Sequence, residues 1–141
     1  MAEFKGRSRR LLLVEALFMS LLVMELASTQ VSGKKHVHVT SAMGDGETIY
    51  VHCKSKDNDL GVQKLENGQG FQWSFHVNLF RTTLFYCNVS WRDISDFYFD
   101  AYDYQRDRYV CSDCRWLFAP EGLYSWNDDN QGWVFRYDWR P

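Results

Sequence analysis

The chain has 141 residues, of which 45% are hydrophobic and 17% aromatic, and its 16 basic and 18 acidic residues give a formal net charge of −2. A chain of this length is expected to form one domain. The composition, with only two prolines, excludes a disordered or fibrous chain. The lack of a basic excess argues against a nucleic-acid binder.

Residues 1–33 are predicted to be a signal peptide. Four basic residues precede an apolar run whose longest uninterrupted stretch is Ala16–Met24, whereas a membrane-spanning helix needs about 20 apolar residues. We expect cleavage between residues 27 and 34, although Glu15 is unusual in such a leader. A retained anchor or amphipathic helix is disfavoured because the four downstream cysteines suit an oxidising compartment. Residues 34–141 are then a secreted, extracellular domain without stable membrane insertion.

Beyond residue 33, apolar and polar residues alternate with the period of two that is typical of β-strands. The alternating runs are 36–40, 49–54, 71–77, 83–91, 97–102 and 133–139, with shorter candidates at 115–118 and 123–126. Turn-forming residues separate them at 44–46, 57–61, 67–70, 120–122 and 128–132. Seven or eight short strands at this spacing predict an all-β fold, a small antiparallel β-sandwich or barrel.

Four cysteines, Cys53, Cys87, Cys111 and Cys114, are expected to form two structural disulfides. A zinc site is disfavoured because only one pair is close in sequence, and a thioredoxin-like site because the Cys-x-x-Cys motif lacks a βαβ context. Joining Cys53 or Cys87 to the 111–114 segment closes a long loop and contributes about 3–4 kcal/mol, whereas a Cys111–Cys114 bridge closes almost nothing. We therefore expect two long-range bridges and leave their exact partners open.

Asn88-Val89-Ser90 is an acceptor sequence for N-glycosylation. Asn88 lies in the opposite phase to Cys87, so its side chain should point away from the core. We expect the exported chain to be glycosylated at this residue.

The sequence shows no cofactor or metal motif. His36 and His38 share one face of a strand, and with His52 they could approach a metal, but no spacing places a third ligand. Exposed polar positions are the better interpretation. The cluster Asp57-Asn58-Asp59 lacks the downstream glutamate of a calcium loop and is interpreted as a turn.

No catalytic constellation is recognised either, so the chain is not expected to be an enzyme. Nucleophile-elbow and zinc-protease motifs are absent from the sequence. Aspartates crowd one half of the chain, but their spacing singles out no pair that could flank a glycosidic bond. They are Asp93, Asp96, Asp100, Asp103, Asp107 and Asp113.

Five segments occur together in one order over about residues 36–139. They are Val51–Gly61, Gly68–Phe75 with Trp73, Thr83–Trp91 with Phe85-Tyr86-Cys87, Cys111-x-x-Cys114-x-Trp116 and Gly122-x-Tyr124. In this combination the chain resembles the plant self-incompatibility S-protein family, the S-protein homologues, and departs from it only in the charged residues of the leader. The resemblance implies a small, secreted plant β-sandwich whose four cysteines form bridges, and it transfers no catalytic residue. The best-known members are stigma-secreted ligands recognised by a pollen membrane protein in poppy.

Two functions follow as hypotheses. The resemblance implies a secreted, non-enzymatic ligand of an unidentified plant membrane protein or receptor, which it would contact through its loops. The candidate loops are 55–61, 66–70, 92–96, 104–110 and 127–132. The alternative is a secreted carbohydrate-active or cell-wall-binding domain, suggested by the aspartates and by second-face aromatics such as Tyr50, Tyr86 and Tyr98. A close carboxylate pair beside an exposed Trp in a deep cleft would favour this alternative.

Overall fold

The computed structural model describes residues 14–17, 19 and 33–140. It divides into two compact units, Met1–Ser32 and Gly33–Pro141. In the first unit, residues 14–17 and 19 are helical. The leader expected at 1–33 lies largely outside the described residues and stays a prediction. No helix within the described part of the chain has the length and apolar character needed to cross a membrane.

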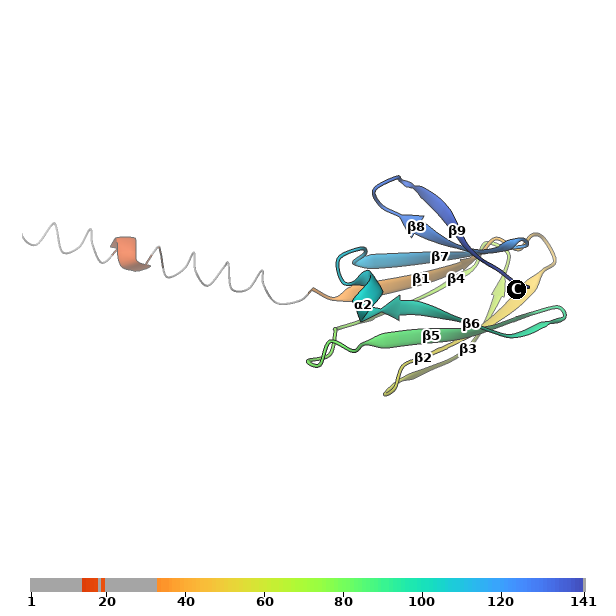
Figure 1. Cartoon of the computed structure of the whole chain (residues 1–141), viewed down its shortest axis with the longest axis horizontal. Helices are drawn as coiled ribbons and strands as arrows, with labels where there is room; N and C mark the ends of the chain where they lie inside the picture. Colours follow the sequence, from red (N-terminus) through yellow and green to blue (C-terminus); the bar gives the residue numbers. More distant parts are fainter. Residues whose placement is uncertain (1–13, 18, 20–32, 141) are drawn as a thin grey trace, which may run out of the picture. The chain divides into compact units, whose positions relative to one another are not determined.

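The second unit is a sandwich of two β-sheets (Figure 1). One sheet has the spatial order β4 (Gly70–Phe75), β1 (Lys35–Ser41), β7 (Asp113–Ala119), β8 (Gly122–Asn127) and β9 (Gly132–Asp138). The other has the order β3 (Asp59–Glu66), β2 (Thr48–Lys54), β5 (Leu84–Trp91) and β6 (Ile94–Asp103). A short helix, α2 (Tyr104–Asp107), follows β6. The predicted β-sandwich is confirmed, and its only parallel pair within the described residues is β1–β7.

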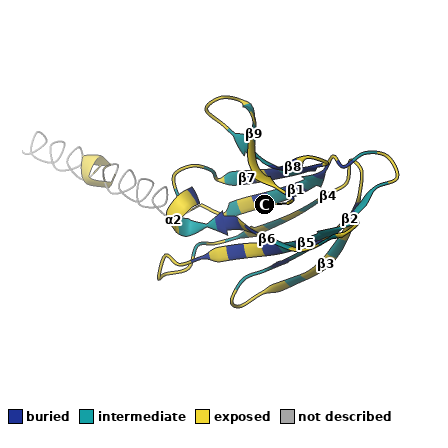
Figure 2. Cartoon of the chain, turned by 45° about the vertical axis from the view of Figure 1, so that its right-hand side comes forward, coloured by how far each residue is buried: buried dark blue, intermediate teal, exposed yellow. Residues whose placement is uncertain are grey.

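The core lies between the sheets and follows the alternation of the sequence. In β2, for example, Ile49, Val51 and Cys53 are fully buried while their neighbours reach the outer face (Figure 2). Burial of each such aliphatic side chain contributes about 1.5–3 kcal/mol. The hydrophobic pattern of β1, β2 and β5 therefore fixes which face each strand turns inward.

Two tryptophans complete the core with satisfied indole groups. Trp116 on β7 donates from Nε1 to the carbonyl of Ala101 on β6 at 2.9 Å, which links the two sheets by a buried hydrogen bond. Trp139 donates to the carbonyl of Ala119 at 2.6 Å. Because a buried N–H without a partner destabilises the folded state, these contacts fix the orientation of both rings.

Strand β3 was not predicted from the sequence. The sequence predicts a turn over 57–61, which includes the first residues of this strand. In the structure these residues pair with β2, and the register of the pairing shifts at Gly61, which has a φ of 75°. The glycine thus sits in a β-bulge, where a positive φ is accommodated without strain. Since β3 is an edge strand with only Leu65 buried, it lacks the alternation that marks the other strands.

The expected disulfide pairing is wrong. The bridges join Cys53 to Cys87 and Cys111 to Cys114. Cys53 and Cys87 are register partners on the neighbouring strands β2 and β5, with Cα atoms 4.0 Å apart. Antiparallel pairing brings directly opposite residues close together, and loop entropy alone does not include this constraint of the native structure. Cys111 and Cys114 meet because the chain turns after α2, where the amide of Cys111 donates to the carbonyl of Asp107.

The strand directions place the connections at two ends of the sandwich. One end, here called the α2 end, holds the segments 55–58, 76–83, 104–112 and 128–131. The opposite end holds 42–47, 67–69, 92–93 and 120–121. Figure 1 shows α2 and the β4–β5 connection at the same end. Segments far apart in sequence therefore share one surface.

Candidate functional site

A cleft of about 370 Å³ opens at the α2 end, between helix α2 with the turn after it and the β8–β9 hairpin. This volume lies at the lower end of the range for small-molecule pockets. The charged residues and tryptophans that line it are Arg106, Asp107, Arg115, Trp116, Trp126, Asp128, Asp129 and Arg136.

The α2 wall is built by reciprocal capping. Asp103 ends β6 and accepts a hydrogen bond from the amide of Gln105 at 2.9 Å, while the carboxylate of Asp107 accepts from the amide of Asp103 at 2.9 Å. These contacts satisfy amides that a helix start leaves free, so a four-residue helix can form. The wall is therefore fixed by contacts within the chain.

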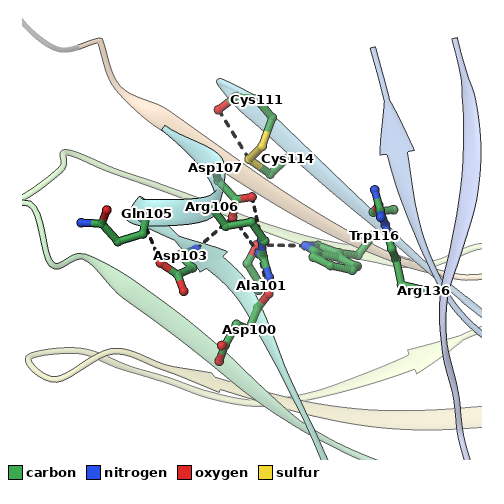
Figure 3. A network of polar contacts seen from close by, with 11 residues as sticks. Asp100, Ala101, Asp103, Gln105, Arg106, Asp107, Cys111, Cys114, Trp116 and Arg136 are labelled. Atoms are coloured by element: carbon green, nitrogen blue, oxygen red, sulfur yellow. Dashed lines mark hydrogen bonds and ion pairs between the residues drawn. A yellow bond between two sulfur atoms is a disulfide. The ribbon is translucent and has the colours of Figure 1, made fainter. Parts of the chain in front are cut away.

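Asp107 is buried and paired with Arg106. The Arg106 guanidinium lies 2.7 Å from the Asp107 carboxylate and also donates to the carbonyl of Asp100 at 2.8 Å (Figure 3). Burial works to lower the pKa of Arg106, but the hydrogen bond and attraction from Asp107 outweigh it and raise the pKa. Arg106 therefore stays charged at every physiological pH and keeps Asp107 engaged.

The floor and the second wall carry aromatic and polar groups. The Arg106 guanidinium lies 5.6 Å from the ring centre of Trp116, and the Cys111–Cys114 bridge borders the same space. On the hairpin, Arg136 donates to Ser125 at 2.7 Å. Figure 3 shows Arg106 and Arg136 reaching the region of Trp116 from α2 and β9.

The cleft combines charges of both signs with side chains that are already paired. The three arginines of the cleft are matched by three aspartates, so the cleft has no strong preference for one sign of charge. Asp107 is committed to Arg106, and none of the cysteines is free. No described residue in the cleft combines a free nucleophile with a hydrogen-bonded base.

The structure divides the predicted recognition loops between the two ends. Loops 104–110 and 127–132 form opposite walls of the cleft, and the turn within 55–61 lies at the same end. Loops 66–70 and 92–96 lie at the opposite end. In 92–96 the connection is short, because β6 already begins at Ile94.

The histidines are separated. His36 and His38 are on β1, whereas His52 is on β2 in the other sheet. His38 contacts Asp113 at 2.7 Å, and His52 contacts Asp59 at 2.5 Å. The described residues contain no group of three or more His, Cys, Asp or Glu placed to hold a metal ion. Hydrogen bonds between Ser55 and Asn58 close a turn that contains Asp57 and Asn58. Asp59 follows this turn as the first residue of β3.

The crowded aspartates serve different partners. Asp93 pairs with Arg140, Asp96 accepts from Asn88, and Asp113 lies between His38 and Arg115. Asp103 and Asp107 are engaged at α2, where they accept from backbone amides and Asp107 pairs with Arg106.

Asn88 lies on β5 with its amide turned to the outer face. It donates to Asp96 and to the hydroxyl of Tyr98, both at 3.1 Å. These two contacts form only in the folded chain, and a glycan on Nδ2 would replace them. Glycosylation at Asn88 stays a prediction. Mass spectrometry of peptides from secreted protein would detect the added mass.

Two surface features were missed from the sequence. Leu79 and Phe80, in the β4–β5 connection, are 97% and 85% exposed. In the sequence they are recognisable only as two adjacent apolar residues between Asn78 and Arg81, outside any alternating run. On the outer face of the β8–β9 hairpin, Tyr124 pairs edge to face with Phe135, and Trp126 does so with Trp133. Trp133 and Phe135 are 41% and 49% exposed, because this hairpin lies at the edge of its sheet.

Comparison with known proteins relates the whole β-domain to one family. A family model described as plant self-incompatibility protein S1 matches residues 36–139. S-protein homolog 24 of Arabidopsis thaliana is 36% identical over 106 residues, which cover 72% of this chain and 70% of the relative. Self-incompatibility protein S1 of Papaver rhoeas is 36% identical over 99 residues, which cover 69% of this chain and 71% of that protein.

A solved structure has the same fold. It represents the SPH (self-incompatibility protein homologue) proteins, described as a widespread family of small, highly stable, secreted proteins from plants. The similarity has a TM-score of 0.54 at 15% identity and covers 76% of this chain and 90% of that one.

Proposed function

The chain belongs to the plant self-incompatibility protein S1 family, and from this membership we propose that it is a secreted, non-enzymatic ligand of a plant membrane protein. The expected leader and the two disulfides support export, because disulfides persist in oxidising compartments. The structurally similar SPH proteins are described as secreted. An extracellular ligand acts on a cell through its membrane, so its receptor is a membrane protein.

One observation carries the choice of surface. Loops 104–110 and 127–132, which are distant in sequence, form the two walls of a single cleft. Internal contacts hold both walls: Asp107 holds the α2 side, and the Arg136–Ser125 hydrogen bond holds the hairpin. A surface fixed before binding loses little conformational entropy on association. The cleft and its two walls are therefore the proposed receptor-contact surface.

Binding to plant protoplasts tests this proposal. Labelled protein comprising residues 34–141 should bind saturably, and protease treatment of the protoplasts should abolish binding. Arg136→Ala combined with Asp129→Ala should weaken binding about tenfold, as expected when central polar contacts are lost. Lys64→Ala on β3, an exposed position outside the cleft, is the matched control and should bind like the original chain.

Two results would contradict the receptor proposal. One is protoplast binding that survives protease treatment. The other is a cleft double variant that remains folded, with an unchanged melting temperature, and binds as tightly as the Lys64→Ala control.

Cell-wall binding is the second candidate, favoured by the aromatic face of the β8–β9 hairpin. Trp126 and Trp133, in edge-to-face contact at 5.3 Å, offer ring surface of the kind on which sugar rings stack. Adsorption to insoluble cell-wall polysaccharide that is lost in Trp133→Ala would support this function. Release of soluble sugar, abolished by one Asp→Asn change, would go further and favour an enzyme.

A further inference from the structure

Asn88 lies in the middle of the outer face of the four-stranded sheet. It is on β5, an inner strand of that sheet, and its register partner on β6 is Tyr98. Its neighbours along the strand, Cys87 and Val89, are fully buried, so the Asn88 side chain has the outward phase, and the ribbon of β5 alternates between buried and exposed residues in Figure 2. The one N-glycosylation acceptor sequence of the chain, Asn88-Val89-Ser90, therefore opens onto a sheet face.

Three tyrosines surround Asn88 on this face. Tyr86 precedes Asn88 by two residues on β5 and points to the same side. Tyr98 lies directly opposite Asn88, and Tyr50 on β2 lies diagonally to it. Cβ atoms of opposite residues in a sheet are about 4.5–5.5 Å apart, and those of diagonal neighbours about 7–8 Å. Since Tyr86, Tyr98 and Tyr50 are 37%, 60% and 45% exposed, their rings lie within reach of a sugar attached to Asn88.

The polar atoms around Asn88 are suited to bind sugar groups. Its two present partners, Asp96 and Tyr98, are both exposed, so they can turn aside when a sugar is attached to Nδ2. The Asp96 carboxylate and the Tyr98 hydroxyl are then free to bind sugar hydroxyl groups. Oδ1 of Asn88 is buried and has no hydrogen-bond partner among the described residues. The unmodified side chain thus leaves a polar atom unsatisfied, and the first sugar brings donors close to it.

Charge does not identify what occupies this face, because it carries Lys54 and Lys64 as well as Asp96 and Asp100. The acceptor sequence does identify it, because an N-glycan is attached within the face itself. The first sugar of an N-glycan is N-acetylglucosamine, whose ring presents C–H groups that pack on aromatic rings and hydroxyl groups that form hydrogen bonds. The tyrosines and Asp96 offer both kinds of partner.

We propose that an N-glycan on Asn88 covers the outer face of the four-stranded sheet, with its first sugars packed on Tyr98 and Tyr86. The sugars remove ring surface from water, and they bond to Asp96 and to the Tyr98 hydroxyl. The α2 end stays open, because its segments connect the strands beyond this face. The proposal therefore concerns a surface separate from the cleft and does not depend on the receptor.

The covalent step precedes the pairing of β5. In the secretory pathway, Nδ2 of Asn88 in the unfolded acceptor sequence attacks C1 of the first sugar of a lipid-linked oligosaccharide. The Nδ2–C1 bond forms, the bond from C1 to the diphosphate oxygen breaks, Nδ2 loses one proton, and the lipid diphosphate leaves. The contacts of Asn88 with Asp96 and Tyr98 form only in the folded chain, so they do not oppose this transfer.

Two substitutions at Ser90 separate the glycan from the surface that it covers. Ser90→Thr keeps the acceptor sequence, whereas Ser90→Ala removes it and leaves Asn88 and the tyrosines in place. The full chain with its leader is produced in plant cells, and the secreted protein is examined by peptide mass spectrometry. We expect a glycan at Asn88 in the original chain and in Ser90→Thr, and none in Ser90→Ala.

Hydroxyl-radical footprinting of the same proteins measures how far the glycan covers the face. Oxidation of Tyr98 and Tyr86 should be about twofold or more slower in Ser90→Thr than in Ser90→Ala, because the sugars shield both rings. Tyr109, which is 89% exposed at the α2 end, is the internal control and should be oxidised equally in the two variants.

The proposal is overturned if Asn88 is unmodified in the secreted protein. It is also overturned if a glycan is attached but Tyr98 is oxidised as fast as in Ser90→Ala, because the glycan then extends into solvent. An unmodified chain retained in the cytosol would count against both this proposal and export. Loss of receptor binding with Tyr98 still protected would count only against the receptor proposal.

Discussion

Tyr102 places a hydroxyl in the core that has no hydrogen-bond partner among the described residues. Burial, with a further contribution from Asp107, raises its pKa from 10.0 to about 12. An unfolded chain would therefore release this proton at lower pH than the folded one. The contribution of Tyr102 to the free energy of unfolding is constant below pH 10 and declines as the pH rises from 10 toward 12.

Replacing Tyr102 by Phe removes both the unpaired hydroxyl and the alkaline titration. We expect Tyr102→Phe to leave the free energy of unfolding unchanged or to raise it by about 1 kcal/mol at neutral pH. Above pH 10 the variant should lose stability less steeply than the original chain. Denaturant unfolding across the alkaline range measures both effects, and a parallel pH dependence in the two proteins would contradict the assignment.

Glu47 gives the corresponding effect on the acid side. Hydrogen bonds from Arg92 and then Trp91 hold the pKa of the Glu47 carboxyl below its ordinary value of 4.5. A depressed pKa means that Glu47 stabilises the fold above about pH 4.5 and that this contribution is lost as the pH falls through the lower, folded value. In Glu47→Gln, unfolding followed by tryptophan fluorescence should depend less on pH below that point. Equal acid sensitivity would show that the contact is absent in solution.

Gly122 is required where β8 begins. It has a φ of 155°, and a Cβ at this position would lie 2.1 Å from the backbone oxygen of Tyr137. Gly122→Ala should therefore destabilise the fold by about 3 kcal/mol or more, measured by thermal or denaturant unfolding. Gly132→Ala is the control, because its nearest neighbour would be the carbonyl of Asn130 at 3.9 Å. Similar losses in both variants would contradict this account of the close approach at Gly122.

At the scale of elements, the two disulfides contribute differently. The Cys53–Cys87 bridge spans 34 residues and is fully buried between β2 and β5, while Cys111–Cys114 spans three and lies at the cleft. Loop entropy gives about 3–4 kcal/mol for the first bridge and about 2 kcal/mol or less for the second. Paired Cys→Ala replacement at 53 and 87 should therefore lower the melting temperature more than the same change at 111 and 114.

Access of reductant provides a second readout of the same difference. Mild reductant should open Cys111–Cys114 first, because Cys111 is partly exposed whereas both sulfurs of the other bridge are buried. Mass spectrometry after thiol alkylation identifies the order. Early alkylation of Cys53, or any native peptide that joins Cys53 or Cys87 to residues 111–114, would contradict the pairing.

At the scale of the whole molecule, the alternation of apolar and polar residues predicted the strands of the sandwich that bury one face. The alternation around Val51 and Val89 identified core strands because each faces the opposing sheet. The same pattern correctly predicted strand β9, but there Trp133 and Phe135, which alternate like core residues, are 41% and 49% exposed at the sheet edge. Alternation reports strand conformation, but it does not report whether another layer covers the face.

The candidate site was predictable only in part. Loops 104–110 and 127–132 could be named as surface segments, but their meeting across one cleft depends on pairings between strands distant in sequence. The Cys53–Cys87 bridge was missed for the same reason, since nothing local shows that β2 lies beside β5. The Leu79–Phe80 turn escaped because an apolar pair in a short connection has no periodicity to interpret.

Site-resolved crosslinking on living cells tests the central claim, that the α2 end contacts a membrane protein. A photoreactive residue replaces Asp129 on the cleft wall in one preparation and Lys64 on β3 in another, both at exposed positions. After illumination on plant protoplasts, the Asp129 preparation should label one membrane protein, and unlabelled domain should compete for it, while the Lys64 preparation labels none. Equal labelling from both positions, or capture of polysaccharide alone from Asp129, would contradict the account.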